Sequence, residues 1–212
     1  MAPRDATDHR LLATADDRLL AAAAAGDVAA TGAALADGAD PDARAADGTP
    51  ATMIATRGHH TDALRALLDA GADVDAQDAT LDNPLLYAGR EGFLDVVRVA
   101  NEAEADPTIT NRYGGVAHIP ASERGHVEVV RYLLNETDID VDHVNRLGWT
   151  ALLEAILLSD GGPRHQEIVE LLLEAGADPD LADGDGVRPL THARDRGQTE
   201  IVRLLEAADA RP

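Results

Sequence analysis

The fold is decided by the stretch DGTPATMIATRGHHTDALRALLDAGADVDA, residues 47–76. Thr49 and Pro50 are typical of a helix start, because a Thr hydroxyl can accept an orphan backbone N–H and proline fits the first helical turn. The pattern predicts a helix over residues 51–57. Gly58 then stands where a chain leaving a helix needs the left-handed conformation.

A second helix is predicted after this turn, and the Gly-Ala-Asp sequence at 71–73 ends it. Its apolar residues recur at the spacing of one helix face, namely Ala63, Leu64, Leu67 and Leu68. Both helices are too short to be stable alone. They therefore need neighbouring units to cover them.

Weaker copies of this unit occur before and after it. The glycines between paired helices are Gly26, Gly58, Gly92 and Gly125, with gaps of 32, 34 and 33 residues. Gly197 follows 72 residues later, and subtracting two periods of 33 leaves six extra residues. We assign about five of these six to a glycine-rich insert at 159–164, either an ordinary length variation or a mobile lip beside a binding surface.

The unit closely resembles the ankyrin repeat, whose period is about 33 residues. The matching residues are Gly48, Thr49, Pro50, Ala55, Gly58, His59, Leu67, Leu68, Gly71, Ala72 and Asp73. The resemblance covers roughly residues 17–208. It implies an all-α solenoid of about six stacked helix-turn-helix units with short hairpin fingers.

We expect a disordered tail at 1–9 and a single repeat domain at 10–210. Its approximate units are 10–43, 44–76, 77–108, 109–142, 143–181 and 182–210. In a repeat array each unit contacts only its neighbours, so the domain should be elongated.

The composition excludes several classes of protein. The net charge of −21 argues against general nucleic-acid binding, which depends on a basic surface. The chain has no cysteine, hence no disulfide framework, and no apolar run of membrane-spanning length. The first ten residues contain no apolar leader core. These features indicate a cytoplasmic protein that binds no membrane, and arginine without lysine is typical of GC-rich, bacterial coding.

No motif predicts catalysis, a cofactor or a metal. Residues 138–142 read DIDVD, but a calcium loop would need Gly and Glu where His143 and Trp149 stand. His59 and His126 occupy the Gly-His turn of the family, in which the ring usually bonds neighbouring backbone, and His60 is predicted to lie on the surface. His118 stands at a leucine position of the family, and we expect a buried, hydrogen-bonded side chain there.

The resemblance implies a binding face made by fingers and first helices on the concave side. The candidate residues are Arg57, Tyr87, Arg90, Arg112, Tyr113, Glu123, Arg124, Arg146, Trp149, Leu157, Leu158 and Arg196, with Glu91 and Leu147 in the same row. This row is expected to be basic and aromatic within an acidic chain, and arginine and aromatic residues are the usual hot-spot types at interfaces. The prediction is a monomeric, non-enzymatic adaptor, inhibitor or stabiliser that binds another protein through units three to five, through an acidic peptide or loop.

Other interpretations stay open. Arginines near helix ends also answer the helix dipole, and Trp149 could pack only between fingers. A small anionic ligand could bind between Tyr87, Tyr113, His118, Glu154 and Trp149. An enzymatic use of Glu123, His118 and Glu154 lacks a nucleophile or metal, and the high negative charge opposes self-association.

Overall fold

The computed structural model describes residues 13–211, so the expected tail at 1–9 lies outside the described residues. Twelve helices form six consecutive pairs in this part of the chain. The first helices of the pairs are α1 (Ala15–Ala25), α3 (Ala51–Arg57), α5 (Pro84–Glu91), α7 (His118–Glu123), α9 (Ala151–Leu157) and α11 (Pro189–Asp195). The second helices are α2 (Val28–Ala36), α4 (Thr61–Asp69), α6 (Leu94–Glu102), α8 (Val127–Glu136), α10 (Pro163–Glu174) and α12 (Thr199–Ala207).

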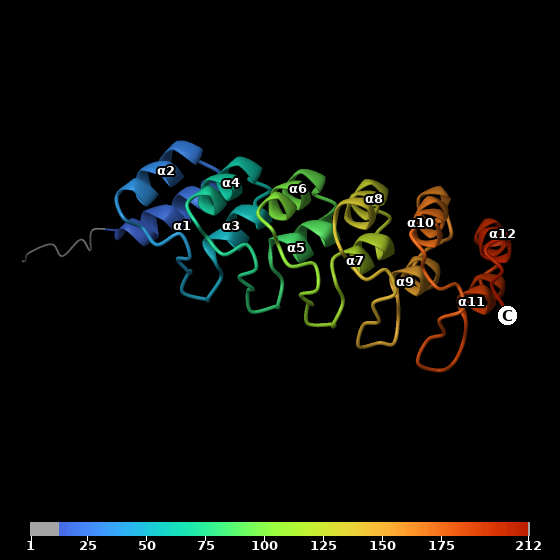
Figure 1. The fold of residues 1–212 in the computed structure, drawn as a ribbon. Coiled ribbons are helices and arrows are strands. Elements are labelled where there is room, and N and C mark those ends of the chain that lie inside the picture. Colours follow the sequence, from blue (N-terminus) through green and yellow to red (C-terminus); the bar gives the residue numbers. More distant parts are fainter. Residues whose placement is uncertain (1–12, 212) are drawn as a thin grey trace, which may run out of the picture.

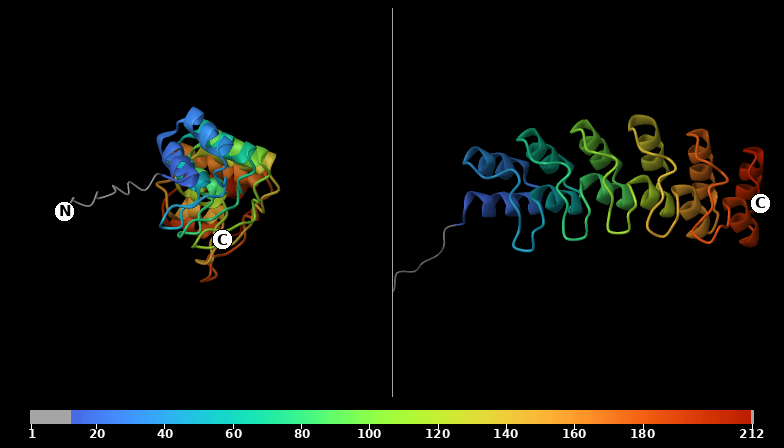
Figure 2. Two further views of the ribbon diagram at one scale, coloured as in Figure 1. Left: turned by 90° about the vertical axis from the view of Figure 1, so that its left-hand side faces the viewer. Right: turned by 60° about the horizontal axis from the view of Figure 1, so that its bottom comes forward.

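The pairs stack side by side into an elongated all-α solenoid (Figure 1). First helices pack against first helices and second helices against second helices, which gives two layers. A long loop projects from the first-helix layer between successive pairs, and Figure 2 shows these fingers aligned on one side of the array. Within residues 13–211 the fingers carry no strand, only an isolated bridge between Arg44 and Pro50.

The apolar stripes explain the stacking. Leu64 and Leu67 of α4 are fully buried, as the helical spacing of the sequence predicts. Equivalent pairs, such as Val96 with Val97 and Ile168 with Val169, fill the same layer in other units. One continuous core therefore runs along the array and stabilises helices that are too short to be stable alone.

Helix starts differ from unit to unit. Asn83 and Thr150 accept the N–H groups of Leu86 and Leu153 and so cap α5 and α9. The prediction for Thr49 is wrong, because Pro50 is the cap residue of α3 and no side chain caps that helix. The N–H of Thr49 instead donates to Asp47.

The turn between α3 and α4 also corrects two predictions. Gly58 has φ −77°, and His59 takes the left-handed φ of 55°. Two histidines follow Gly58, and the bond to neighbouring backbone that was expected of His59 is made by the second of them. His60 donates a hydrogen bond to the carbonyl of Ala24 at 3.2 Å. Gly58 is still required, because a Cβ there would lie 2.4 Å from the His60 ring. His59 stacks on Phe93 instead, with ring centroids 3.8 Å apart.

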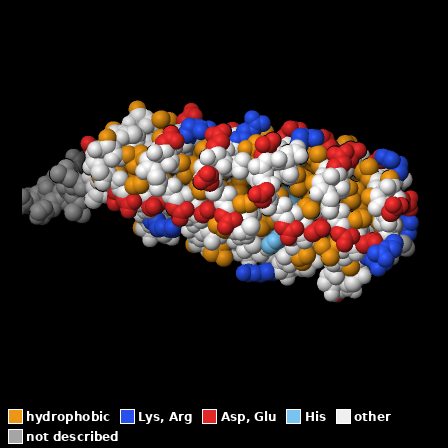
Figure 3. All heavy atoms as spheres, viewed as in Figure 1, with side chains coloured by type: hydrophobic (Ala, Val, Ile, Leu, Met, Phe, Trp, Pro, Cys, Tyr) orange, Lys and Arg blue, Asp and Glu red, His pale blue; other side chains and the backbone are white. Residues whose placement is uncertain are grey.

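Aspartates form hydrogen bonds between successive units. A carboxylate in one loop accepts a backbone N–H from the next loop, joining Asp42 to Asp73 (2.7 Å), Asp75 to Asp106 (3.1 Å) and Asp142 to Asp178 (2.9 Å). Thr108 occupies the corresponding place between units three and four. Acidic side chains accordingly follow the length of the array as a band in Figure 3, so part of the negative charge is structural.

The insert at 159–164 is a loop held by hydrogen bonds. Ser159 donates to the carbonyl of Ala155 and accepts the N–H of Gly161. Gln166 donates to the carbonyl of Gly161, and α10 then begins at Pro163. These bonds tie the insert to both helices of its own unit.

Candidate functional site

First helices and fingers of units two to five line a groove of about 640 Å³, the central groove. Its residues are Arg57, Thr80, Asp82, Tyr87, Arg90, Glu91, Asn111, Arg112, Tyr113, Gly115, Ile119, Pro120, Glu123, Arg124, Asn145, Leu147, Glu154 and Leu158. Of the predicted contact residues, all but Arg146, Trp149, Leu157 and Arg196 belong to this lining. The structure therefore brings most of the predicted row together in one concavity.

The four residues outside the groove have other surroundings. Arg146 links two fingers, since its N–H donates to the carbonyl of Tyr113 at 2.9 Å and its guanidinium to that of Arg112 at 2.7 Å. Trp149 and Leu157 are half-buried, and Arg196 is exposed at the end of α11 in the last unit.

The fingers before α5, α7, α9 and α11 are each built around an Asn or Asp side chain that is not among the predicted site residues. Asn111 accepts the N–H of Tyr113 at 2.8 Å, and Asn145 accepts that of Leu147 at 2.9 Å. These bonds hold Tyr113 and Leu147 at the finger tips, where they are 54% and 57% exposed. The signal in the sequence is a recurring Asn or Asp at one register of the fingers, namely Asp78, Asn111, Asn145 and Asp183.

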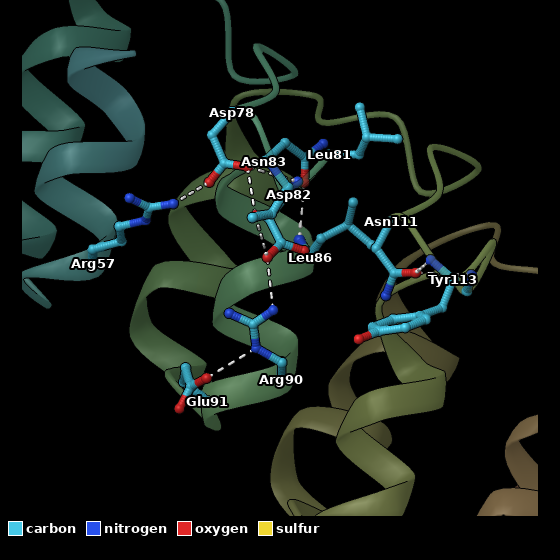
Figure 4. A network of polar contacts seen from close by, with 12 residues as sticks. Arg57, Asp78, Leu81, Asp82, Asn83, Leu86, Arg90, Glu91, Asn111 and Tyr113 are labelled. Atoms are coloured by element: carbon cyan, nitrogen blue, oxygen red, sulfur yellow. Dashed lines mark hydrogen bonds and ion pairs between the residues drawn. The ribbon is translucent and has the colours of Figure 1, made fainter. Parts of the chain in front are cut away.

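Ion pairs between elements neutralise most of the groove's arginines (Figure 4). Arg57 pairs with Asp78, whose side chain is fully buried, at 2.5 Å. Arg90 binds Asp82 at 2.6 Å and Glu91 at 2.9 Å, and its guanidinium lies 4.7 Å from the centre of the Tyr87 ring. Arg124 reaches Glu91 at 3.2 Å.

The expected basic character of this face is therefore wrong. The groove is lined by four arginines, Arg57, Arg90, Arg112 and Arg124, and by four carboxylates, Asp82, Glu91, Glu123 and Glu154. The sequence row could not show this balance, because several carboxylates come from other positions of the repeat. The groove is formally neutral within a chain of net charge −21.

Glu154 is the most unusual of these carboxylates. It lies on α9 among buried apolar residues and is only 6% exposed. Its Oε1 accepts a hydrogen bond from Asn145 Nδ2 at 2.7 Å. Burial raises the pKa of Glu154 to about 7, with a further contribution from the negative charge of Glu123, while the Asn145 bond acts in the opposite direction. Within residues 13–211 no cation pairs with Glu154.

His118 does not reach the groove. It is fully buried, and its Nε2 donates to the carbonyl of Val141 at 3.3 Å, but Nδ1 has no partner among the described residues. Burial lowers its pKa to about 4, so the ring is neutral at pH 7. The imagined acid–base set of Glu123, His118 and Glu154 is thus not assembled. Of the five residues suggested to bind a small anionic ligand, Tyr87, Tyr113 and Glu154 line the groove, whereas His118 and Trp149 do not.

Two further properties concern the whole described chain. No cluster of three or more His, Asp or Glu side chains within residues 13–211 is arranged to hold a metal ion. In the same residues no helix is both long enough and apolar enough to cross a membrane.

The paired short helices, glycine turns and projecting fingers define a helical repeat protein of the solenoid class. Comparison with known proteins identifies the family. The profile for three copies of the ankyrin repeat matches residues 19–111 and 103–183. The ankyrin repeat protein YahD of Escherichia coli strain K12 is 44% identical over 191 residues, covering 90% of this chain and 95% of YahD.

Solved structures agree with that assignment. An ankyrin repeat domain (ABAYE2397) from Acinetobacter baumannii AYE has 51% identity and a TM-score of 0.89, covering 91% of this chain and 98% of that one. The ankyrin repeat protein EF0377 has 36% identity and a TM-score of 0.86, covering 89% and 96%. This chain belongs to the ankyrin repeat family. Ankyrin repeat proteins are typically non-enzymatic modules for protein–protein interaction.

Proposed function

We propose that the central groove, through its residues in units three to five, binds a segment of another protein. The observation that carries this proposal is the group of large apolar side chains held at its rim. Tyr113 and Leu147 stand on the finger tips, and Leu158 at the end of α9 is 47% exposed. Large apolar side chains rimming a groove mark interaction sites more often than scattered ones do.

The rim residues are also of the kind that contributes most at interfaces. Arg112 lies over the ring of Tyr113, with its guanidinium carbon 4.8 Å from the ring centre. Such a stacked pair presents a broad, stiff surface at low cost in side-chain entropy. Arginine and tyrosine are enriched among residues whose truncation weakens binding most.

A small anionic ligand in the same groove is the alternative. A volume of about 640 Å³ falls in the range of ligand pockets. Glu123 and Glu154 oppose it, because both carboxylates face the groove without a cation from residues 13–211. An anion would have to approach both charges, so the protein-segment proposal is the stronger.

The test is affinity capture from cells that naturally produce the protein. Wild type is compared with one groove variant, the double substitution Tyr113→Ala/Leu158→Asp. The control is Val28→Asp, which places the same charge on an exposed apolar residue of α2. We expect a partner held by wild type and by the control and lost by the groove variant. A partner held equally by all three would refute the groove as the site, and circular dichroism establishes that each variant is folded.

A further inference from the structure

The charges of the central groove are not all matched from within the chain. Asp82 and Glu91 each bind an arginine at 3.2 Å or less. Glu123 and Glu154 bind none within residues 13–211, although both line the groove. The part of the groove between α7 and α9 therefore carries two carboxylates without a counter-ion.

The Glu154 side chain is buried and held in one orientation. Leu152, Leu153 and Ile156 of the same helix are buried, and a carboxylate among them loses most of its hydration. One oxygen is fixed by Asn145, which is itself held by the backbone of its finger. The other oxygen has no protein donor in the described chain, so a nearly buried, oriented acceptor faces the groove.

A buried charge of this kind is costly unless a counter-charge meets it. Leu158 and the ring of Tyr113 line the same groove and offer exposed apolar surface. A side chain with an apolar stem and a cationic end fits both features. Arginine fits best, since its planar fork can bind a carboxylate through two parallel hydrogen bonds.

We propose that the bound partner segment presents a basic side chain, most favourably arginine, to Glu123 and Glu154 of the central groove. This inference rests on the proposed function and specifies its partner. It replaces the acidic segment expected from the sequence, because three of the four arginines that line the groove are paired with carboxylates and the fourth, Arg112, is stacked on Tyr113. Arg112, which is stacked on the ring of Tyr113 and not paired with a carboxylate, can contact the backbone of the segment or an acidic residue beside the basic one.

The perturbed ionisation of Glu154 fits such a role. With a pKa of about 7, the Glu154 carboxyl group is partly protonated at neutral pH, and a cation brought beside it by the partner would favour its charged form. Glu123 on α7 is the charged group whose field acts on Glu154, and the other neighbour that shifts its ionisation is the uncharged Asn145.

The experiment is selection of a randomised peptide library displayed on phage. The targets are wild type, Glu154→Gln and the uncharged double variant Tyr113→Ala/Leu158→Ala, with Glu174→Gln on the exposed face of α10 as the matched control. Wild type and the control should enrich peptides with Arg or Lys at one position. Against Glu154→Gln we expect that preference to fall about tenfold or more. A Glu123→Gln target gives an independent reading if the first variant is unstable.

Two failures are distinguishable. Peptides that bind wild type, are lost with Tyr113→Ala/Leu158→Ala and show no preference for basic residues would refute the inference and leave the groove proposal standing. Enriched peptides that bind the Tyr113→Ala/Leu158→Ala target equally, or a library from which nothing enriches on wild type, would overturn both.

Discussion

Replacing Glu154 with Gln should stabilise the protein at alkaline pH. The carboxyl group has an ordinary pKa of 4.5 and a pKa of about 7 in the folded chain, mainly because it is buried. A raised pKa means that ionisation is less favourable in the folded state than in the unfolded one. Wild type therefore keeps its full stability below pH 4.5 and loses some of it as the pH rises through 7.

The magnitude follows from the two pKa values. At about 1.4 kcal/mol per pH unit, the difference between 4.5 and about 7 corresponds to about 3 kcal/mol above neutral pH. Gln has the same shape, keeps an oxygen for the Asn145 bond and carries no charge. At pH 8 the variant should exceed wild type by up to about 3 kcal/mol, or about 6–12 °C in Tm for a domain of this size.

The assay is thermal unfolding followed by circular dichroism at pH 5 and pH 8. Because pH 5 lies only about half a unit above the ordinary pKa of 4.5, little of the loss has built up there, and the advantage of Glu154→Gln should shrink to about 1 kcal/mol or less. The exposed Glu174→Gln should shift Tm by less than about 2 °C at either pH. A Glu154→Gln variant no more stable than wild type at pH 8 would refute the reasoning about burial.

Two other substitutions test the fold. Thr108→Asn should supply a side-chain oxygen for the N–H of Asp140, as Asp75 and Asp142 do for the loops that follow them, without adding a negative charge beside other aspartates. It should raise the free energy of unfolding by about 1 kcal/mol in urea titrations, whereas Thr108→Ala should not. Gly58→Ala should lower stability by about 1–3 kcal/mol, because its Cβ would meet the His60 ring at 2.4 Å. Gly32→Ala is the matched control: this helical position is open, so it should gain about 0.5–1 kcal/mol. A loss in Gly32→Ala as large as that in Gly58→Ala would contradict the close-approach argument.

The repeat architecture could be predicted from the sequence because its signals are local and recur. The glycine spacing gives the period of the repeat. The apolar stripe of α4 can be recognised from a few consecutive residues of that one helix. The errors fall where the units differ. Two histidines after Gly58 move the left-handed residue and the turn bond one position onward, which a template with a single Gly-His pair does not anticipate.

The position of the groove could also be predicted, but its charge could not. The row of candidates follows from the repeat register, so Tyr113, Arg112 and Leu158 fall in one lining. Two of the groove's arginines have their ion-pair partners in other units. Arg57 pairs with Asp78, 21 residues away, and Arg124 pairs with Glu91, 33 residues away. Pairings across units depend on how the helices stack, and no local pattern records them.

The most direct test of the central claim places a photo-crosslinking amino acid at position 113, on the finger tip above the groove, in living cells that produce the protein. The same amino acid at position 28, on the exposed side of α2, is the control. We predict a discrete crosslinked adduct with a second protein from position 113 and none from position 28. An adduct from position 28 alone, or no adduct from position 113, would contradict the assignment of the groove as the binding surface.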